Sequence, residues 1–179
     1  MPKRKIEIRF GGSGGQGVVL AAQILGRAAV IDGMNALQTQ AYGAEARGSL
    51  TKSEVIISED KIGFPAVRQS DILVTMSQEA VNVLLKDLKQ TGILIVDSTN
   101  VKSIPEIGAT VHRFLIMDTA KKKFGEGLCA NMVMLGVLIQ VVGLVSVRSM
   151  EEAIRKFTAR RNAEINLKAF REGLQLSEH

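Results

Sequence analysis

The chain has 179 residues, a length that suits one domain with a substantial buried core, and a single domain over residues 1–179 is expected. Hydrophobic residues make up 46% and charged residues 23%, as in ordinary globular proteins, whereas aromatic residues make up 4% and Trp is absent. So few aromatic side chains disfavour nucleic-acid binding by base stacking. The net charge of +5 suits an anionic ligand, an acidic partner protein or simply a solvated basic surface.

The single cysteine, Cys129, excludes an internal disulfide and cannot supply an iron-sulfur or zinc site. The N-terminal MPKRK has no apolar region of the kind that a secretory signal carries. The most apolar stretch, Cys129 to Val145, contains Asn131 and Gln140 and is too short to span a membrane, so a buried core helix is expected there. We therefore expect a cytoplasmic protein that does not contact the membrane.

Apolar runs of strand length alternate with helical patterns, which predicts a three-layer α/β/α, Rossmann-like sheet with helices on both faces. The predicted strands are, in chain order, residues 6–10, 35–40, 53–58, 71–76, 93–97 and 111–116. The predicted helices are residues 17–30, 78–88, 131–142 and one or two between 149 and 175. Glu59 to Gly63 looks like a hairpin turn, so the sheet is expected to be mostly parallel with an antiparallel hairpin element.

The C-terminal segment carries apolar residues at helical spacing, first Met150, Ile154 and Phe157 and then a second stripe that includes Ile165. Asn162 stands where the second helix would be capped. The pattern favours a docking helix with a basic outer face, and a partner-binding helix is the alternative.

The stretch from Ile6 to Leu20 joins an apolar strand to a helix through five glycines. Gly12, Gly14 and Gly17 satisfy G-x-G-x-x-G, a spacing that lets the backbone turn tightly and approach a diphosphate at a helix N-terminus. A phosphorylated ligand is therefore the first hypothesis, and a turn that only packs strand against helix is the alternative. The candidate contacts are Gly12, Ser13, Gly14, Gly15, Gln16 and Gly17.

Two common nucleotide sites do not match this loop. A dinucleotide-binding unit carries an acidic residue at the end of its second strand, but here that strand ends in Gln38, Thr39 and Gln40. The nearest acid, Asp32, precedes the strand and is expected to form a turn with Gly33. No Gly-Lys-Ser or Gly-Lys-Thr follows the glycines, so classical NAD binding is disfavoured and a P-loop is excluded.

The segment from Thr39 to Lys52, TQAYGAEARGSLTK, carries Tyr42, Glu45, Arg47 and Lys52 in a glycine-containing loop after the second strand, and its residues 42–51 are expected to be irregular. Loops at the carboxyl ends of neighbouring strands face the same crevice, so this one should lie beside the glycine loop. Arg47 and Lys52 could then complement a bound phosphate. An equally serious alternative is that Glu45 and Arg47 only fix the loop, or that the loop contacts another subunit.

No catalytic group stands out. His112 lies in a late strand and His179 at the C-terminus, and neither belongs to a recognisable triad or zinc motif. The carboxylates are scattered without the spacing of a metal cage or an acid-base pair. We therefore predict no catalytic and no metal-binding residues, and the chain alone is a poor candidate for a complete enzyme.

Three segments together resemble the gamma subunit of the 2-oxoacid:ferredoxin oxidoreductases, over residues 6–173. They are the GGSGGQG loop, the TQAYGAEARGS segment and the NMVMLG run that begins at Asn131. Within the second, TQ-x-YG-x-EARG is similar to the 2-oxoglutarate branch, whereas pyruvate and ketoisovalerate relatives tend to differ there. One departure is Ser49, where the family usually has a second glycine, which leaves open the detailed conformation at that point.

The resemblance implies a multisubunit complex that oxidatively decarboxylates a 2-oxoacid, passes electrons to ferredoxin and releases an acyl-coenzyme A. It also implies alpha, beta and ferredoxin-like partner subunits, which hold the thiamine diphosphate and the iron-sulfur clusters. For this chain it implies coenzyme A binding at the glycine loop and no activity in isolation, where homo-oligomers are an open alternative. Two other functions stay open: a free-standing Rossmann-like nucleotide-binding domain and a purely structural subunit.

Overall fold

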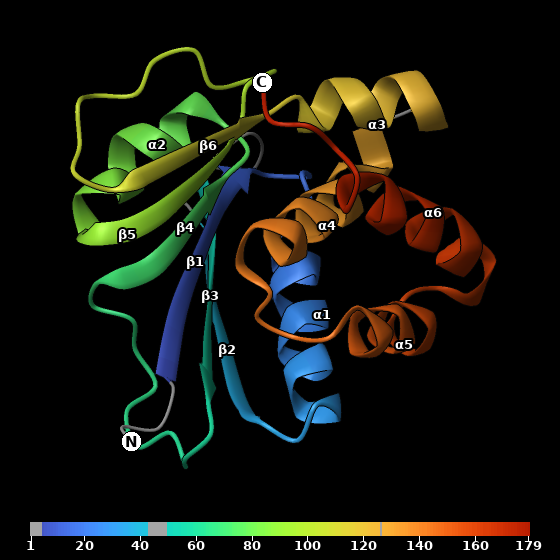
Figure 1. The fold of residues 1–179 in the computed structure, drawn as a ribbon, viewed down its shortest axis with the longest axis horizontal. Helices are drawn as coiled ribbons and strands as arrows, with labels where there is room; N and C mark the ends of the chain where they lie inside the picture. Colours follow the sequence, from blue (N-terminus) through green and yellow to red (C-terminus); the bar gives the residue numbers. More distant parts are fainter. Residues whose placement is uncertain (1–4, 43–49, 126) are drawn as a thin grey trace.

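The computed structural model describes residues 5–42, 50–125 and 127–179, which form a sheet with helices on both faces (Figure 1). The strands are β1 (Lys5–Ser13), β2 (Asn35–Tyr42), β3 (Leu50–Ser58), β4 (Ser70–Thr75), β5 (Leu88–Asp97) and β6 (Thr110–Phe114). The helices are α1 (Val18–Ile31), α2 (Gln78–Leu84), α3 (Ile116–Phe124), α4 (Ala130–Val142), α5 (Val147–Phe157) and α6 (Ala163–Gly173), with 3-10 turns η1 (Leu85–Asp87), η2 (Gly127–Cys129) and η3 (Arg160–Asn162). The predicted three-layer α/β/α class is confirmed.

The strand order is β2-β3-β1-β4-β5-β6. Strand β3 runs antiparallel to both of its neighbours, and the pairs β1·β4, β4·β5 and β5·β6 are parallel. The predicted mixed sheet, mostly parallel with an antiparallel element, is therefore confirmed. In the register of β1 and β3, Gly12 faces Thr51 and Ser13 faces Leu50, so the start of β3 lies beside the glycine loop.

The predicted hairpin turn at Glu59 to Gly63 is wrong. The antiparallel hairpin is formed by β2 and β3, which pair from Asn35·Ser58 to Tyr42·Thr51, and its connection, residues 43–49, lies outside the described residues. Residues 59–69 instead lead to β4 on the other side of β1. Pro65, which has no amide to donate, interrupts this segment where a returning strand would have to pair.

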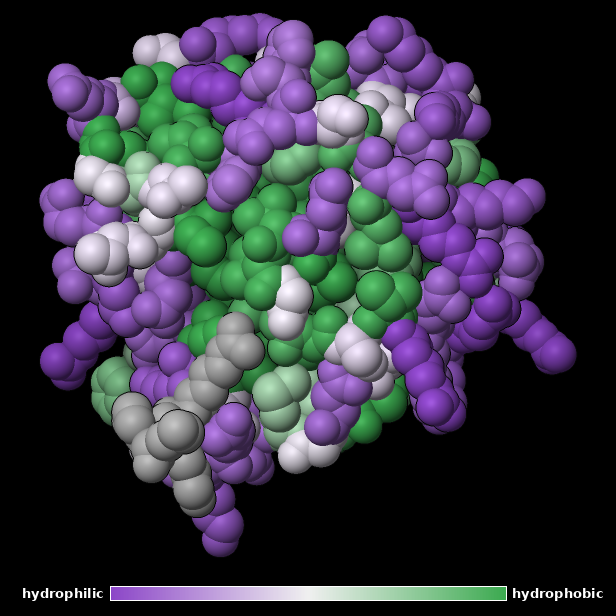
Figure 2. All heavy atoms as spheres, viewed as in Figure 1, coloured by the Kyte–Doolittle hydropathy of each residue, from purple (hydrophilic) through white to green (hydrophobic). Residues whose placement is uncertain are grey.

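The helices are divided unequally between the two faces of the sheet. Helices α1 and α3 to α6 lie on one face and α2 lies on the other (Figure 1). Helix α2 approaches β1 closely at Gly11, where an added Cβ would lie 2.5 Å from Leu84 Cδ1 and 2.9 Å from Ala80 Cβ. Figure 2 shows hydrophobic side chains gathered in the middle of this view, between the sheet and the larger helical layer, with hydrophilic residues on both flanks.

Helix α4 is the predicted core helix, since every residue from Asn131 to Ile139 is buried. It crosses α6 at a pair of glycines. An added Cβ on Gly136 would lie 2.1 Å from the carbonyl oxygen of Phe170, and one on Gly173 would lie 2.0 Å from that of Val133. The predicted docking of the C-terminal helix is thus confirmed, and it depends on contact between two helix backbones. Among the described residues, no helix is both long and apolar enough to cross a membrane.

Two details of the helical layer differ from the sequence predictions. The sequence predicts a strand up to Ile116, but β6 ends at Phe114 and α3 begins at Ile116. Because Leu115 and Ile116 continue the apolar run, the pattern hides the change from strand to helix. Asn162 does occupy the position before α6, but its side chain makes no capping hydrogen bond.

Candidate anion-binding site

The glycine loop joins β1 to α1 at the carboxyl edge of the sheet. Gly15 and Gly17 have positive φ angles of 92° and 75°, a conformation that L side chains adopt only with strain. The amide of Gln16 donates to the carbonyl oxygen of Ser13 at 3.1 Å and closes the turn. Two of the loop glycines are therefore required by the backbone geometry.

The side chain of Gln16 links the loop to the neighbouring strand. Its Oε1 accepts a hydrogen bond from the amide of Ser13 at 2.7 Å, and its Nε2 donates to the carbonyl oxygen of Met76 at 3.0 Å. The Ser13 amide is thus already bonded within the protein. Gly14 and Gly15 are exposed, so their backbone is the accessible part of the loop.

Helix α1 begins at this loop with an unneutralised N-terminus. Its N-cap residue, Gly17, provides no capping side chain, and the first turn contains no acidic residue. The aligned peptide dipoles of a 14-residue helix therefore leave partial positive charge at the loop.

From the start of α4, Asn131 Nδ2 donates to the Gly17 carbonyl oxygen at 3.4 Å. An added Cβ on Gly17 would lie 2.5 Å from that nitrogen, so the glycine allows the close approach of α4.

The two predicted cationic contacts have different outcomes. Arg47 lies outside the described residues. Lys52 faces Gly11 across the β1·β3 pair and therefore lies on the sheet face that α2 covers, whereas an added Cβ on Gly12 would meet Gln16 on the opposite face. The Nζ of Lys52 is 3.0 Å from Glu54 Oε1. Its charge already has a partner, and its contact with a ligand stays a prediction.

Lys52 belongs to a network around Arg9, which is 2% exposed. The Arg9 guanidinium lies 2.8 Å from Glu54 Oε1 and 3.0 Å from Asp87 Oδ2, and it donates to the carbonyl oxygen of Val67 at 2.8 Å. Burial would raise the pKa of Glu54, but its bonds to Lys52 and Arg9 outweigh burial and hold that pKa below its ordinary value. The network ties β1, β3 and η1 together beneath the loop.

Asp97 is the buried acid at the same edge of the sheet, at the end of β5. Its carboxylate accepts from the amides of Thr99 at 3.1 Å and Met117 at 3.2 Å, which ties β5 to the start of α3. Burial raises the pKa of Asp97, and these hydrogen bonds only partly oppose that effect. With 0% exposure, it cannot contact a substrate in this conformation. His112 lies at β6, with Nδ1 3.1 Å from Glu178 Oε2.

Asp32 lies at the C-terminal end of α1, at the far end of the helix from the glycine loop. Its carboxylate accepts from the amide and hydroxyl of Ser146 at 2.6 and 2.8 Å, and from the hydroxyl of Ser149 at 2.5 Å. Burial would raise the pKa of Asp32, but these bonds outweigh it and lower the pKa. Beyond the expected turn, Asp32 anchors the N-terminus of α5 to α1.

Sequence reasoning missed Asn131 as part of the site and gave Gln16 no individual role. Asn131 is 5% exposed in the first turn of α4, whose other polar side chain, Gln140, is exposed in the last turn, and that buried amide was the available signal. Its partner Gly17 is 114 residues away, so spacing could not identify the contact. Within the described ranges, no group of three or more His, Cys, Asp or Glu residues could hold a metal ion.

Comparison with known proteins supplies the family context. Residues 7–176 match the model of the pyruvate ferredoxin/flavodoxin oxidoreductase family. The chain is 42% identical to 2-oxoglutarate synthase subunit KorC of Methanocaldococcus jannaschii over 185 aligned positions, covering 99% of each chain. Its structure is similar to the crystal structure of the gamma subunit of a keto/oxoacid ferredoxin oxidoreductase from Geobacter sulfurreducens, with a TM-score of 0.85 and 41% sequence identity. The match covers 95% of this chain and 96% of that one.

A third similar structure is a larger protein. The 2-oxoglutarate:ferredoxin oxidoreductase from Magnetococcus marinus, with 2-oxoglutarate, coenzyme A and succinyl-CoA bound, matches 96% of this chain with a TM-score of 0.86. The match covers 31% of the Magnetococcus chain, so there the same fold forms one part of a longer polypeptide. At 22% identity, this likeness shows the fold alone.

Proposed function

The chain belongs to the pyruvate ferredoxin/flavodoxin oxidoreductase family, as the gamma subunit of a 2-oxoacid:ferredoxin oxidoreductase complex, and we propose that its glycine loop helps to bind coenzyme A. The observation that carries the proposal is the uncapped, acid-free N-terminus of α1 beside the exposed residues Gly14 and Gly15. A helix N-terminus of this kind favours a diphosphate. The chain is an enzyme subunit, and the proposal gives it a substrate-binding part in the complex.

The loop residues have distinct parts in this proposal. The amides of Gly14, Gly15 and Gly17 meet the diphosphate, since the amide of Gln16 already donates to Ser13, and Gly12 allows close approach of the strand and loop. Gln16 holds the amide of Ser13 at 2.7 Å and so fixes the shape of the loop. Arg47 supplies charge, as does Lys52 if it exchanges its bond to Glu54 for the ligand. The positive φ at Gly15 and Gly17 supports a loop built for backbone donors.

We propose 2-oxoglutarate as the 2-oxoacid and succinyl-CoA as the product. The support is the 42% identity to a chain named 2-oxoglutarate synthase subunit, together with the TQAYGAEARG segment, residues 39–48. Alpha, beta and ferredoxin-like subunits are the proposed partners, and they hold the thiamine diphosphate and iron-sulfur clusters and pass electrons to ferredoxin. Cys129 is buried and cannot supply a cluster alone, and a cytoplasmic location stays a prediction.

A purely structural role for the loop is the second candidate. It is favoured by one observation, the bonding of Gln16 to both Ser13 and Met76, which uses one of the loop's amide donors inside the protein. In that case the glycines serve only the packing of β1, α1 and α4.

Kinetics of the assembled complex distinguish the two roles. Gly14→Val places a branched side chain where the diphosphate approaches, and Arg47→Ala removes one charge-assisted contact of about 1.5 to 3 kcal/mol, or roughly 10- to 150-fold in affinity. Both variants should raise the KM for coenzyme A and leave the KM for 2-oxoglutarate nearly unchanged. An equal increase in the KM for both substrates in an intact complex would favour the structural role.

A further inference from the structure

The two edges of the sheet are protected very differently. Edge strand β6 has five residues, includes Arg113, and is flanked by the C-terminal residues: the amide of His179 donates to the Arg113 carbonyl oxygen at 2.8 Å. The amide of Arg113 in turn donates to Glu178 Oε1 at 3.3 Å. A short, charged and covered strand is a common defence against unwanted strand pairing.

Edge strand β2 lacks these defences. It has eight residues, NALQTQAY, without a charged residue or a proline. In the part of the chain that the structure describes, its backbone pairs with β3 alone. A long, uncharged edge exposes a row of amide and carbonyl groups and is a template for another strand. The sequence of β2 therefore fits an edge that is covered when the subunit is assembled.

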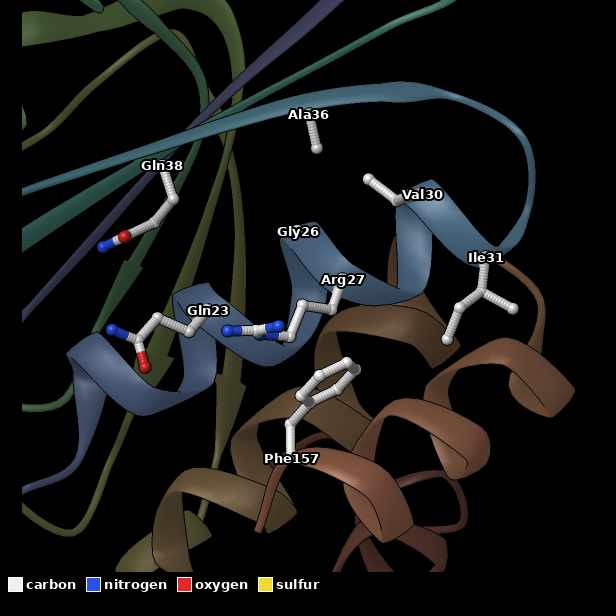
Figure 3. Close-up of a pocket in the computed structure, with 8 residues that line it drawn as sticks. All are labelled: Gln23, Gly26, Arg27, Val30, Ile31, Ala36, Gln38 and Phe157. Atoms are coloured by element: carbon white, nitrogen blue, oxygen red, sulfur yellow. The ribbon is translucent and has the colours of Figure 1, made fainter.

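A groove of about 410 Å³ runs beside this edge, between α1, β2 and the end of α5 (Figure 3). Ala36 and Gln38 extend from β2 toward α1, which contributes Val30 and Arg27 (Figure 3). Val30 is 58% exposed and Phe157 is 40% exposed, so two large apolar side chains face solvent at one place. Exposed apolar residues that line a groove mark a binding surface more often than isolated ones do.

The charge of the groove identifies what kind of segment fits. Its lining residues include one cation and no acid. The Arg27 guanidinium lies 3.9 Å from the centroid of the Phe157 ring, and among the described residues it has no carboxylate partner. A second copy paired through β2 would bring another neutral strand and another Arg27, without a counter-charge from β2 itself. A segment that carries a carboxylate is the complementary occupant.

We propose that β2 and the adjacent groove are the docking surface for an extended segment of another subunit of the oxidoreductase. The segment adds to β2 as a strand, places an apolar side chain between Val30 and Phe157, and pairs a carboxylate with Arg27. Main-chain hydrogen bonds along β2 provide affinity, and the groove and Arg27 provide specificity.

Crosslinking in the complete complex tests which chain occupies the groove. Val30→Cys, labelled with a benzophenone maleimide, presents a photoreactive group there, and the natural Cys129 is buried. Val83→Cys is the matched control, since it is another exposed helical valine on α2, across the sheet. Crosslinks from position 30 to another subunit, absent from position 83, support the proposal. Crosslinks to a second copy of this chain, or none in an intact complex, overturn it.

Charge reversal tests the recognition by Arg27. The chain offers a matched control in Arg68, whose guanidinium lies 5.4 Å from the centroid of the exposed Phe64 ring. Arg27→Glu should weaken binding to the partner subunits by about tenfold or more, whereas Arg68→Glu should leave it nearly unchanged. Equal affinities for the two variants would overturn the proposal. The assay measures assembly, so its outcome does not depend on coenzyme A binding at the glycine loop.

Discussion

Glycines serve opposite purposes in two regions of this molecule. In the loop between β1 and α1, Gly15 and Gly17 take positive φ angles, and an added Cβ on Gly15 would meet nothing within 4 Å. In the helical layer, Gly136 and Gly173 lie where added Cβ atoms would overlap the backbone of the opposite helix. At Gly15 the loop uses glycine for backbone conformation and access, whereas the helix crossing uses glycine for the absence of a side chain. The same substitution should therefore damage function in one region and stability in the other.

The largest effect is expected at the helix crossing. Gly136→Ala should lower the free energy of unfolding by about 3 kcal/mol or more, because the new methyl group would lie 2.1 Å from the Phe170 carbonyl oxygen and α4 and α6 must separate. At this chain length such a loss lowers Tm by roughly 6–12 °C. Thermal unfolding followed by circular dichroism measures it.

The control for this change is Gly26→Ala in the middle of α1. An added Cβ there has its closest neighbours at 3.9 and 4.0 Å, in ordinary van der Waals contact. Replacing a helical glycine by alanine should then stabilise the protein by about 0.5–1 kcal/mol. If the Gly136→Ala protein were as stable as the Gly26→Ala protein, that result would contradict the close crossing of α4 and α6.

The second effect separates the loop from the helical layer. Gly15→Ala should cost on the order of 1 kcal/mol of backbone strain and raise the KM for coenzyme A in the complex roughly tenfold, because a methyl group then stands at the exposed turn. Gly143→Ala is the matched variant, since Gly143 ends α4 with a φ of 60° and also has open space around its Cβ position. It should cost similar strain and leave that KM unchanged. A KM for coenzyme A that rises equally in both variants would remove the distinction between the two regions.

These contrasts also explain what the sequence could predict. The spacing of Gly12, Gly14 and Gly17 and the apolar runs around them predicted the loop, because local patterns report local structure. Glycine spacing does not predict the contact of Gly136 with Gly173, because these two residues are 37 positions apart and meet only when α4 and α6 cross. The position of Lys52 on the α2 face likewise depends on the pairing of β3 with β1.

The sheet likewise contains features that local sequence patterns do not predict. The mixed sheet was predicted from an apparent hairpin turn at Glu59 to Gly63, but the real antiparallel pairs are β2·β3 and β1·β3, because long-range pairing inserts β3 between β2 and β1. Helix α3 was hidden by the apolar residues Leu115 and Ile116 at its start. Tertiary contacts decide such features, and local sequence is nearly silent about them.

The third effect concerns the attachment of α5 to α1 in the helical layer. Asp32→Asn removes carboxylate acceptors for Ser146 and Ser149 and should cost about 1 kcal/mol near neutral pH. The folded state lowers the pKa of Asp32 below 3.8, so this stabilisation is present above the unfolded-state value and is lost as the pH falls through the folded-state value. Urea unfolding of both proteins should show a difference at pH 7 that shrinks toward about pH 3. A difference that stays constant would exclude ionised Asp32 as its source.

The smallest effect is expected at Gln16, where the loop is held by a side chain. Gln16→Ala removes the bonds to the Ser13 amide and the Met76 carbonyl oxygen, each worth about 0.5–1.5 kcal/mol, and should raise the KM for coenzyme A roughly three- to tenfold. Gln16→Glu keeps an acceptor for Ser13 but loses the donor to Met76 and adds negative charge near the diphosphate.

Comparing the KM for coenzyme A of the two Gln16 variants distinguishes a binding loop from a packing turn. If the loop holds a diphosphate, Gln16→Glu should raise the KM for coenzyme A more than Gln16→Ala, and added salt should narrow the gap because it screens the repulsion. The KM for 2-oxoglutarate should not change in either variant. If Gln16 serves packing alone, the variant that retains the Ser13 hydrogen bond should be the milder one, and both Michaelis constants should move together. If Gln16→Ala instead raises the KM for coenzyme A more than Gln16→Glu does, the glycine loop is a second site, like the helix crossing, where glycine serves only structure.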